Sequence, residues 1–161
     1  MSLAIRRAVA AEVPLVLSLI HELAAYEKLS HEVEATEAMI ADALFSQSPR
    51  LFCEIAEWNG EVAGFAVWFL NCSTFAGRFG IYLEDLFVRP AYRGNGIGKA
   101  LLAHLAQTCV ENGWARLQWA VLDWNEPSIA FYKSLGAVMM DEWTVCRVNG
   151  PALAALAKAV P

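Results

Sequence analysis

The sequence predicts a mixed α/β fold, in which a twisted sheet of about six to seven strands carries helices on both faces. Three observations predict it. Apolar residues recur at helical spacing in several segments, and β-rich apolar runs stand between those segments. A glycine-rich stretch then separates a first half rich in antiparallel strand signals from a strand–loop–helix–strand unit. With 161 residues and no linker or repeat, the chain is expected to form a single domain, 1–161.

The first half begins with a short strand, Leu3–Arg7, and a helix, Glu12–Lys28. Within that helix, Leu15, Leu19 and Leu23 follow one face of a 3.6-residue period. A second helix is predicted from Thr36, which has the side chain of a helix cap, to Phe45. Its inward face is expected to consist of Met39, Ile40, Ala43 and Leu44.

Two β-rich runs, Leu51–Trp58 and Glu61–Leu70, are separated only by Asn59–Gly60. That dipeptide tolerates the positive φ angles of a tight turn, so it predicts an antiparallel hairpin. A further strand is expected at Gly80–Val88.

The second half is expected to alternate helices with strands. An amphipathic helix is predicted over Ile97–Asn112, and Gly113 is suited to end it. The later elements expected are a strand at Ala115–Leu122, a helix at Pro127–Leu135, a last strand or hairpin at Ala137–Val148, and a terminal helix at Pro151–Ala159.

Composition excludes several functions. The formal net charge is −5, which does not suit nucleic acid or an anionic membrane as a partner. No apolar run is long enough to span a bilayer and no signal peptide is evident, so a cytoplasmic protein is expected. Neither the four cysteines nor the three histidines follow a metal motif, which predicts free thiols and no metal. Hydrophobic residues make up 57% of the chain, which is compatible with either a well-filled core or a surface buried against a second copy.

The glycine-rich stretch runs Arg93-Gly94-Asn95-Gly96-Ile97-Gly98-Lys99, between a predicted strand and a predicted helix. Glycines let the backbone approach a ligand, and the first N–H groups of a helix favour anions such as a pyrophosphate. A Walker A loop would need glycine at Arg93 and serine or threonine at Ala100, and a dinucleotide fingerprint would need glycine at Lys99. A flexible turn without a ligand is the structural alternative.

The stretch fits the pattern Arg-x-x-Gly-x-Gly, and two other segments accompany it: Leu83-Glu84-Asp85 before it and Trp124-Asn125-Glu126-Pro127-Ser128 after it. Together they resemble the GNAT acetyltransferase superfamily and, within it, the spermidine/spermine (diamine) N-acetyltransferases. The similarity extends from about Ile5 to Val148. It implies a GNAT-type fold, acetyl-CoA as cosubstrate, a small-molecule amine substrate and a homodimer.

The resemblance also implies roles for particular residues. Glu84 is expected to be the general base and Tyr132 the general acid that protonates the departing thiolate. A β-bulge at Glu84–Asp85 would free a backbone N–H for the thioester oxygen. The amine site is expected to contain Tyr26, Glu27, Glu84 and Asp85, with Tyr26 and Glu27 contributed by either subunit. The residues expected to bind acetyl-CoA are Leu86, Phe87, Val88, Arg93, Gly94, Asn95, Gly96, Ile97, Gly98, Lys99, Asn125, Ser128 and Tyr132.

The predicted reaction is therefore direct transfer of acetyl from acetyl-CoA to the amine of a polyamine, a diamine or a thialysine-like compound. Two alternatives stay open. One is acetylation of a protein lysine or N-terminus, and the other is a CoA-binding sensor without catalysis. For Tyr132 and for the carboxylates, a core aromatic ring and solvated strand-end charges are the structural alternatives.

Overall fold

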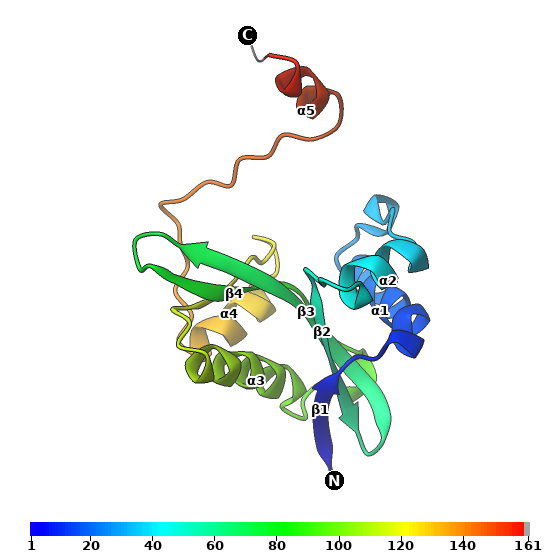
Figure 1. Cartoon of the computed structure of the whole chain (residues 1–161). Helices are drawn as coiled ribbons and strands as arrows, with labels where there is room; N and C mark the ends of the chain where they lie inside the picture. The colour runs from blue at the N-terminus through cyan, green and yellow to red at the C-terminus, as the bar shows by residue number, and fades with distance from the viewer. Residues whose placement is uncertain (160–161) are drawn as a thin grey trace. The chain divides into compact units, whose positions relative to one another are not determined.

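A computed structural model describes residues 1–159, which divide into two compact units, Met1–Leu122 and the chain from Asp123 onward. The first unit contains a five-stranded sheet in the order β1-β2-β3-β4-β5 (Figure 1). Its neighbouring strands are antiparallel except for the β4–β5 pair, which is parallel. The strands are β1 (Leu3–Arg7), β2 (Phe52–Trp58), β3 (Glu61–Ser73), β4 (Arg78–Val88) and β5 (Leu117–Trp119). The predicted α/β class is confirmed, with five strands in place of six to seven.

Helices cover both faces of this sheet, as predicted. Helices α1 (Val13–Tyr26) and α2 (Glu37–Phe45) lie on one face, and α3 (Ile97–Glu111) lies on the other (Figure 1). Phe65 and Val67 of β3 pack with buried residues of α1 and α2 in the main hydrophobic cluster. Three short 3₁₀ turns connect the elements: Ala10–Glu12, Ser30–Glu32 and Pro90–Tyr92.

Local signals in the sequence produce the predicted boundaries. Thr36 caps α2, because its hydroxyl accepts a hydrogen bond from the Met39 N–H at 3.3 Å. Asn59 and Gly60 have φ angles of 52° and 86°, as the predicted hairpin turn requires. The inward orientation predicted for Met39 is wrong, since its side chain is 61% exposed. Ile40 and Leu44 form the buried stripe, and Met39 lies about 100° around the helix from Ile40.

The second unit contains α4 (Glu126–Ser134) and α5 (Gly150–Ala157). The strand or hairpin predicted at Ala137–Val148 is wrong, because this segment forms no strand. Its valines and its tryptophan are residue types that favour a strand, yet Val138, Trp143 and Val145 are largely exposed. A strand requires a hydrogen-bonded neighbour, which composition alone does not provide. Among the described residues, no helix is long and apolar enough to cross a membrane.

All four cysteines are free thiols. Cys53 and Cys109 are buried, as small core residues are, whereas Cys72 and Cys146 are exposed.

A β-bulge interrupts the pairing of β3 with β4. Val67 is in register with Asp85, but the next residue, Trp68, is in register with Leu83. Glu84 is therefore an extra residue in β4, and the predicted bulge is confirmed at the predicted place. Since a bulge breaks the alternation of a strand, the residues after Glu84 have faces opposite to those that a regular strand would give them.

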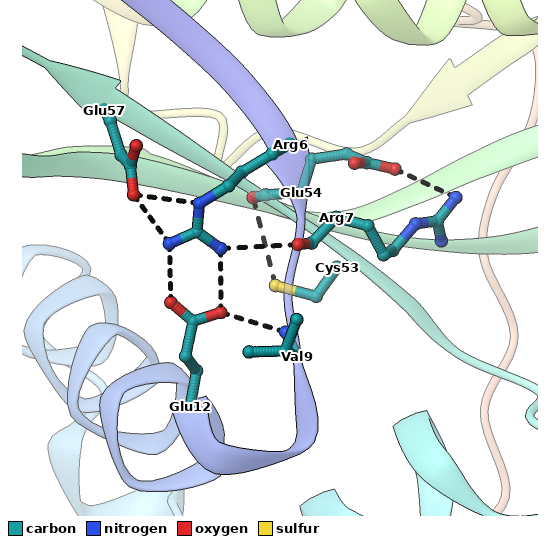
Figure 2. A network of polar contacts seen from close by, with 7 residues as sticks. All are labelled: Arg6, Arg7, Val9, Glu12, Cys53, Glu54 and Glu57. Atoms are coloured by element: carbon teal, nitrogen blue, oxygen red, sulfur yellow. Dashed lines mark hydrogen bonds and ion pairs between the residues drawn. The ribbon is translucent and has the colours of Figure 1, made fainter. Parts of the chain in front are cut away.

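Arg6 connects the start of the chain to the sheet (Figure 2). Its guanidinium contacts the carboxylates of Glu12 and Glu57, each at 2.6 Å. Glu12 also accepts a hydrogen bond from the Val9 N–H at 2.9 Å, so one carboxylate fixes both the turn before α1 and the strand beside it. The hydrogen bond from Arg6 lowers the pKa of Glu12 below its usual value of 4.5.

This lowered pKa gives a prediction about stability. A carboxyl with a lower pKa in the folded state stabilises the fold above its unfolded pKa, and that contribution disappears as the pH falls through the folded value. We expect Glu12→Gln to lower the free energy of unfolding by about 1 kcal/mol at pH 7, the size typical of a partly exposed ion pair. The difference from wild type should shrink below about pH 4.5, which thermal unfolding across pH measures. An equal difference at pH 3 and pH 7 would contradict this account.

Candidate active site

The bulge brings together carboxylates from two elements of one chain. Asp85 is in register with Val67 on the sheet face that α1 and α2 cover, and it is partly buried. Glu84, the extra residue, is exposed. Glu27 directly follows the end of α1 and is partly buried, and its charge acts on Asp85. Glu27, Glu84 and Asp85, three of the four residues expected to bind the substrate, therefore form one cluster.

Burial and like charges change the acidity of this cluster. Burial, followed by the charges of Glu84 and Glu27, raises the pKa of Asp85 to about 7. Burial also raises the pKa of Glu27. Concentrated negative charge in a partly dehydrated place favours a cation as ligand, because a cation relieves the repulsion between the carboxylates.

Tyr26 belongs to the same region but already contacts a cation of the chain. The guanidinium of Arg93 lies over the Tyr26 ring, 4.7 Å from its centroid, and 5.8 Å from the centroid of Phe87. The Arg93 Nε also donates a hydrogen bond to the Val88 carbonyl at 2.9 Å. Arg93 is one of the residues expected to bind acetyl-CoA. Its guanidinium connects the glycine loop to Tyr26, the aromatic residue expected at the amine site, an arrangement that the sequence does not indicate.

An ion pair fixes α1 against the end of β4. Arg89 contacts Glu22 at 2.7 Å and donates a hydrogen bond to the Val62 carbonyl at 2.9 Å. Glu22 lies on α1, five residues before Glu27. This pair therefore helps to hold the end of α1 near the carboxylates of the bulge.

The end of β4 has an edge that faces away from β3. The Arg89 N–H donates to the Ala63 carbonyl at 2.8 Å, so alternation places the Phe87 N–H toward β3 as well. The N–H groups of Leu86 and Val88 then point to the opposite edge. Strand β5 pairs with β4 only at Ile81–Leu83, so it does not cover the N–H groups of Leu86 and Val88.

The bulge is the cause of this orientation. The Ile81 N–H points toward β5, since it donates to the Arg116 carbonyl at 3.0 Å. In a regular strand, the N–H of Phe87 would point the same way as the N–H of Ile81. The extra residue Glu84 shifts this alternation by one residue. The N–H groups of Leu86 and Val88, and not that of Phe87, therefore point away from β3. Leu86, Phe87 and Val88 are all expected to bind acetyl-CoA. The Phe87 side chain, however, is buried in the core cluster, with 5% of it exposed.

The glycine loop leads directly into α3. Gly94 and Gly96 have φ angles of 82° and 75°, a left-handed conformation that favours glycine. The first helical bond of α3 joins the Ala100 N–H to the Gly96 carbonyl at 2.9 Å. The preceding N–H groups, those of Ile97, Gly98 and Lys99, therefore have no partner one helical turn earlier, and the helix dipole reinforces their attraction for an anion.

The loop also has room for a ligand. A Cβ added at Gly94 or Gly96 would meet no atom within 4 Å. Asn95 supports the turn from within, because its side-chain amide donates to the Tyr92 carbonyl at 3.0 Å. These features fit a pyrophosphate that lies against the backbone.

The remaining predicted residues belong to the second unit. Asn125 caps α4, since its side-chain oxygen accepts a hydrogen bond from the Ser128 N–H at 3.4 Å. Tyr132 lies in the last turns of α4 and is buried, and its ring is 5.4 Å from that of Phe131. Asn125 thus has a structural role as the cap of α4, beside the contact with acetyl-CoA expected for it.

One buried charged residue was missed by the sequence interpretation. Glu54 of β2 is 2% exposed, and it contacts Arg7 at 3.1 Å and the Trp68 indole N–H at 3.2 Å. Its strand position alone resembles any solvated charge, and only the pairing with β3 reveals the indole partner. Among the described residues, no group of three or more histidine, cysteine, aspartate or glutamate side chains could hold a metal ion.

The open edge of β4 with its two outward donors, and the glycine loop that leads into α3, fit the acetyl-CoA site expected of an acetyltransferase, and the neighbouring carboxylates fit an amine substrate. The acetyltransferase (GNAT) family profile matches residues 16–137. The chain belongs to this family.

Similar proteins agree with this assignment. A thialysine N-epsilon-acetyltransferase of Bos taurus is 39% identical over 153 residues, which cover 88% of this chain and 89% of the relative. The L-ornithine N5-acetyltransferase NATA1 of Arabidopsis thaliana is 32% identical and covers 96% and 87%. The structure of an integron cassette protein from V. cholerae matches with a TM-score of 0.80 at 30% identity, and it covers 99% of both chains. The chain is thus an acetyl-CoA-dependent N-acetyltransferase with relatives that act on small amines.

Proposed function

We propose that this protein transfers the acetyl group of acetyl-CoA to the amine of a small cationic compound, either a polyamine or diamine or a basic amino acid of the thialysine type. The carboxylate cluster of Glu27, Glu84 and Asp85 beside the open edge of β4 carries the proposal. A substrate with more than one positive charge matches several carboxylates better than a neutral amine would. The names of the thialysine and ornithine acetyltransferases support the same class of substrate.

Backbone N–H groups of the loop and of β4 have separate roles in the proposed transfer. The loop amides from Gly94 to Lys99 bind the pyrophosphate, and the outward N–H groups of Leu86 and Val88 bind the pantetheine arm and polarise the thioester oxygen. A donor of this type contributes about 3 kcal/mol to lowering the barrier.

The family resemblance supports roles for three further residues. Asn125 and Ser128 are proposed to contact the pantetheine arm, and the Tyr132 hydroxyl is proposed to protonate the departing thiolate. The whole chain, 1–161, acts as one acetyltransferase domain. The family profile supports this, since it extends across the boundary at Leu122.

The protein is further proposed to be a cytoplasmic homodimer that uses no metal. Light scattering on the purified chain tests the dimer, and activity in the presence of a chelator tests the metal. Turnover lost to a chelator and restored by a divalent cation would contradict the metal-free mechanism.

Acetyl-CoA-dependent thiol release across a panel of amines tests the substrate. The panel contains spermidine, spermine, putrescine, thialysine, ornithine, lysine and lysine-containing peptides. We expect saturable turnover with a small diamine or basic amino acid, at kcat/KM at least tenfold above that of any peptide. Turnover with peptides alone would favour acetylation of a protein. Binding of acetyl-CoA without turnover of any amine would favour a sensor.

A further inference from the structure

The two neighbouring carboxylates of the bulge have different environments. Asp85 continues a row that runs across three strands, since Cys53 is in register with Val67 and Val67 with Asp85. This row lies under α1 and α2, and its first two members are almost fully buried. Glu84 is the bulge residue, so it has no register partner in β3, and it is exposed. Water therefore solvates Glu84 far better than Asp85.

Two carboxylates act on Asp85, and the arginines of the neighbouring segments contact other groups. Glu27 approaches from the end of α1 and Glu84 from the bulge, and both are negative when ionised. The Cys53 thiol of β2 is neutral, because burial and the neighbouring acids raise its pKa to about 12. Arg93 from the glycine loop lies on the Tyr26 ring. Arg89 is paired with Glu22.

These surroundings favour a carboxyl that gains and loses a proton near neutral pH. Burial and two like charges act in the same direction on Asp85 and raise its pKa to about 7. A general base is most effective when its pKa is close to the working pH, because it is then ionised and still basic enough to take a proton. Asp85 also lies one residue before Leu86, whose N–H points to the open edge, so it is close to the proposed site of the thioester.

We infer that Asp85, and not the exposed Glu84, removes the proton from the substrate ammonium, and that Glu84 and Glu27 bind the substrate's positive charge. This inference rests on the proposed acetyl transfer. It reverses the two roles that the family resemblance implies for Glu84 and Asp85.

The step balances as follows. The ammonium gives one proton to the Asp85 carboxylate, and the freed lone pair of nitrogen forms a bond to the thioester carbonyl carbon. The carbonyl electrons move to oxygen and return as the carbon–sulfur bond breaks, with the bonding pair leaving on sulfur. The nitrogen loses its second proton as the amide forms, and sulfur gains one proton to give the free thiol. Asp85 then releases its proton to water.

The test is the pH dependence of kcat/KM for wild type, Asp85→Asn and Glu84→Gln, with the amine that wild type acetylates best. Wild type should show an acidic limb with a midpoint near pH 7. Asp85→Asn should lose about 10²-fold in kcat/KM, and it should lose the inflection near pH 7, so that its rate follows only the ionisation of the amine at about pH 10. Glu84→Gln should keep the limb and move it to lower pH, because one like charge beside Asp85 is gone. An inflection near pH 7 that disappears in Glu84→Gln, or persists in Asp85→Asn, would overturn the inference.

A second measurement does not depend on activity. The chain has four aspartates, so carboxyl-labelled aspartate gives a simple carbon NMR spectrum in which Asp85→Asn identifies the signal of Asp85. Its midpoint should lie near pH 7 and fall in Glu27→Gln and in Glu84→Gln. A midpoint near pH 4 would overturn the inference. If wild type acetylates no amine in the panel, the proposed function itself has failed, whereas an active enzyme with an unaltered limb in Asp85→Asn refutes only the role of Asp85.

Discussion

Replacement of Tyr132 by phenylalanine should lower kcat by about 10³-fold, within the range that general acids contribute. The variant keeps the buried ring and removes only the hydroxyl, so the packing of α4 is retained. Without a proton donor, the sulfur must leave as an unprotonated thiolate. Affinity for acetyl-CoA, measured by calorimetry, should change by less than about twofold, because an interaction made only in the transition state affects kcat and leaves ground-state binding alone.

Two controls separate this role from a general loss of structure. Tyr92→Phe also removes one hydroxyl, but that hydroxyl is exposed and contacts Glu61 at 2.6 Å, so kcat should stay within about twofold of wild type. An acetyl donor with a more acidic thiol should restore much of the Tyr132→Phe rate, since its sulfur needs less help from an acid. If Tyr132→Phe turned over at the wild-type rate, Tyr132 would be a packing residue only.

Local chemistry explains which parts of the fold were predictable. Thr36 and the Asn59–Gly60 pair act within a few residues of their own positions, so the helix start and the hairpin follow from the sequence. The segment Ala137–Val148 has the composition of a strand but forms none, and no local signal in the sequence reveals whether a neighbouring strand is available to pair with it. The inward orientation predicted for Met39 was wrong for a related reason. Met39 lies beside the buried stripe of α2, and the sequence does not show how wide that stripe is.

The candidate site also has a part that the sequence predicts and a part that it does not. The glycine loop is one continuous segment and the two carboxylates are neighbours in the chain, so a local motif identifies each of them. The contact of Arg93 with Tyr26 joins residues 67 positions apart, and the burial of Glu54 depends on its pairing with β3. The relative environments of Glu84 and Asp85 also depend on tertiary structure. A bulge can be expected from family resemblance, but the two carboxylates differ in burial because Asp85 lies on the sheet face that α1 and α2 cover.

Gly64→Ala should destabilise the protein by about 2–3 kcal/mol, the upper part of the range of about 1–3 kcal/mol for overpacking a filled interior. A Cβ at this position would lie 2.4 Å from the Phe87 carbonyl oxygen and 3.1 Å from the Val88 Cα, both of which are backbone atoms that cannot rotate away. The lower entropy of the unfolded alanine chain offsets only about 0.4–1 kcal/mol of this cost. Urea unfolding with an unchanged m-value would measure the loss.

The same substitution should impair function, because the strand that must move carries the outward N–H groups of Leu86 and Val88. We expect weaker acetyl-CoA binding by calorimetry even at temperatures where the variant is folded. Gly113→Ala is the matched control, because Gly113 follows the end of α3 and lies outside the proposed acetyl-CoA loop. A Cβ there meets no atom within 4 Å, so its cost of about 1–2 kcal/mol comes only from the φ angle of 66°. Gly113→Ala should therefore lower stability and leave acetyl-CoA affinity within about twofold of wild type. A Gly64→Ala variant as stable as wild type would mean that β3 and β4 separate easily, and the strand would then be a poor platform for a fixed donor at Val88.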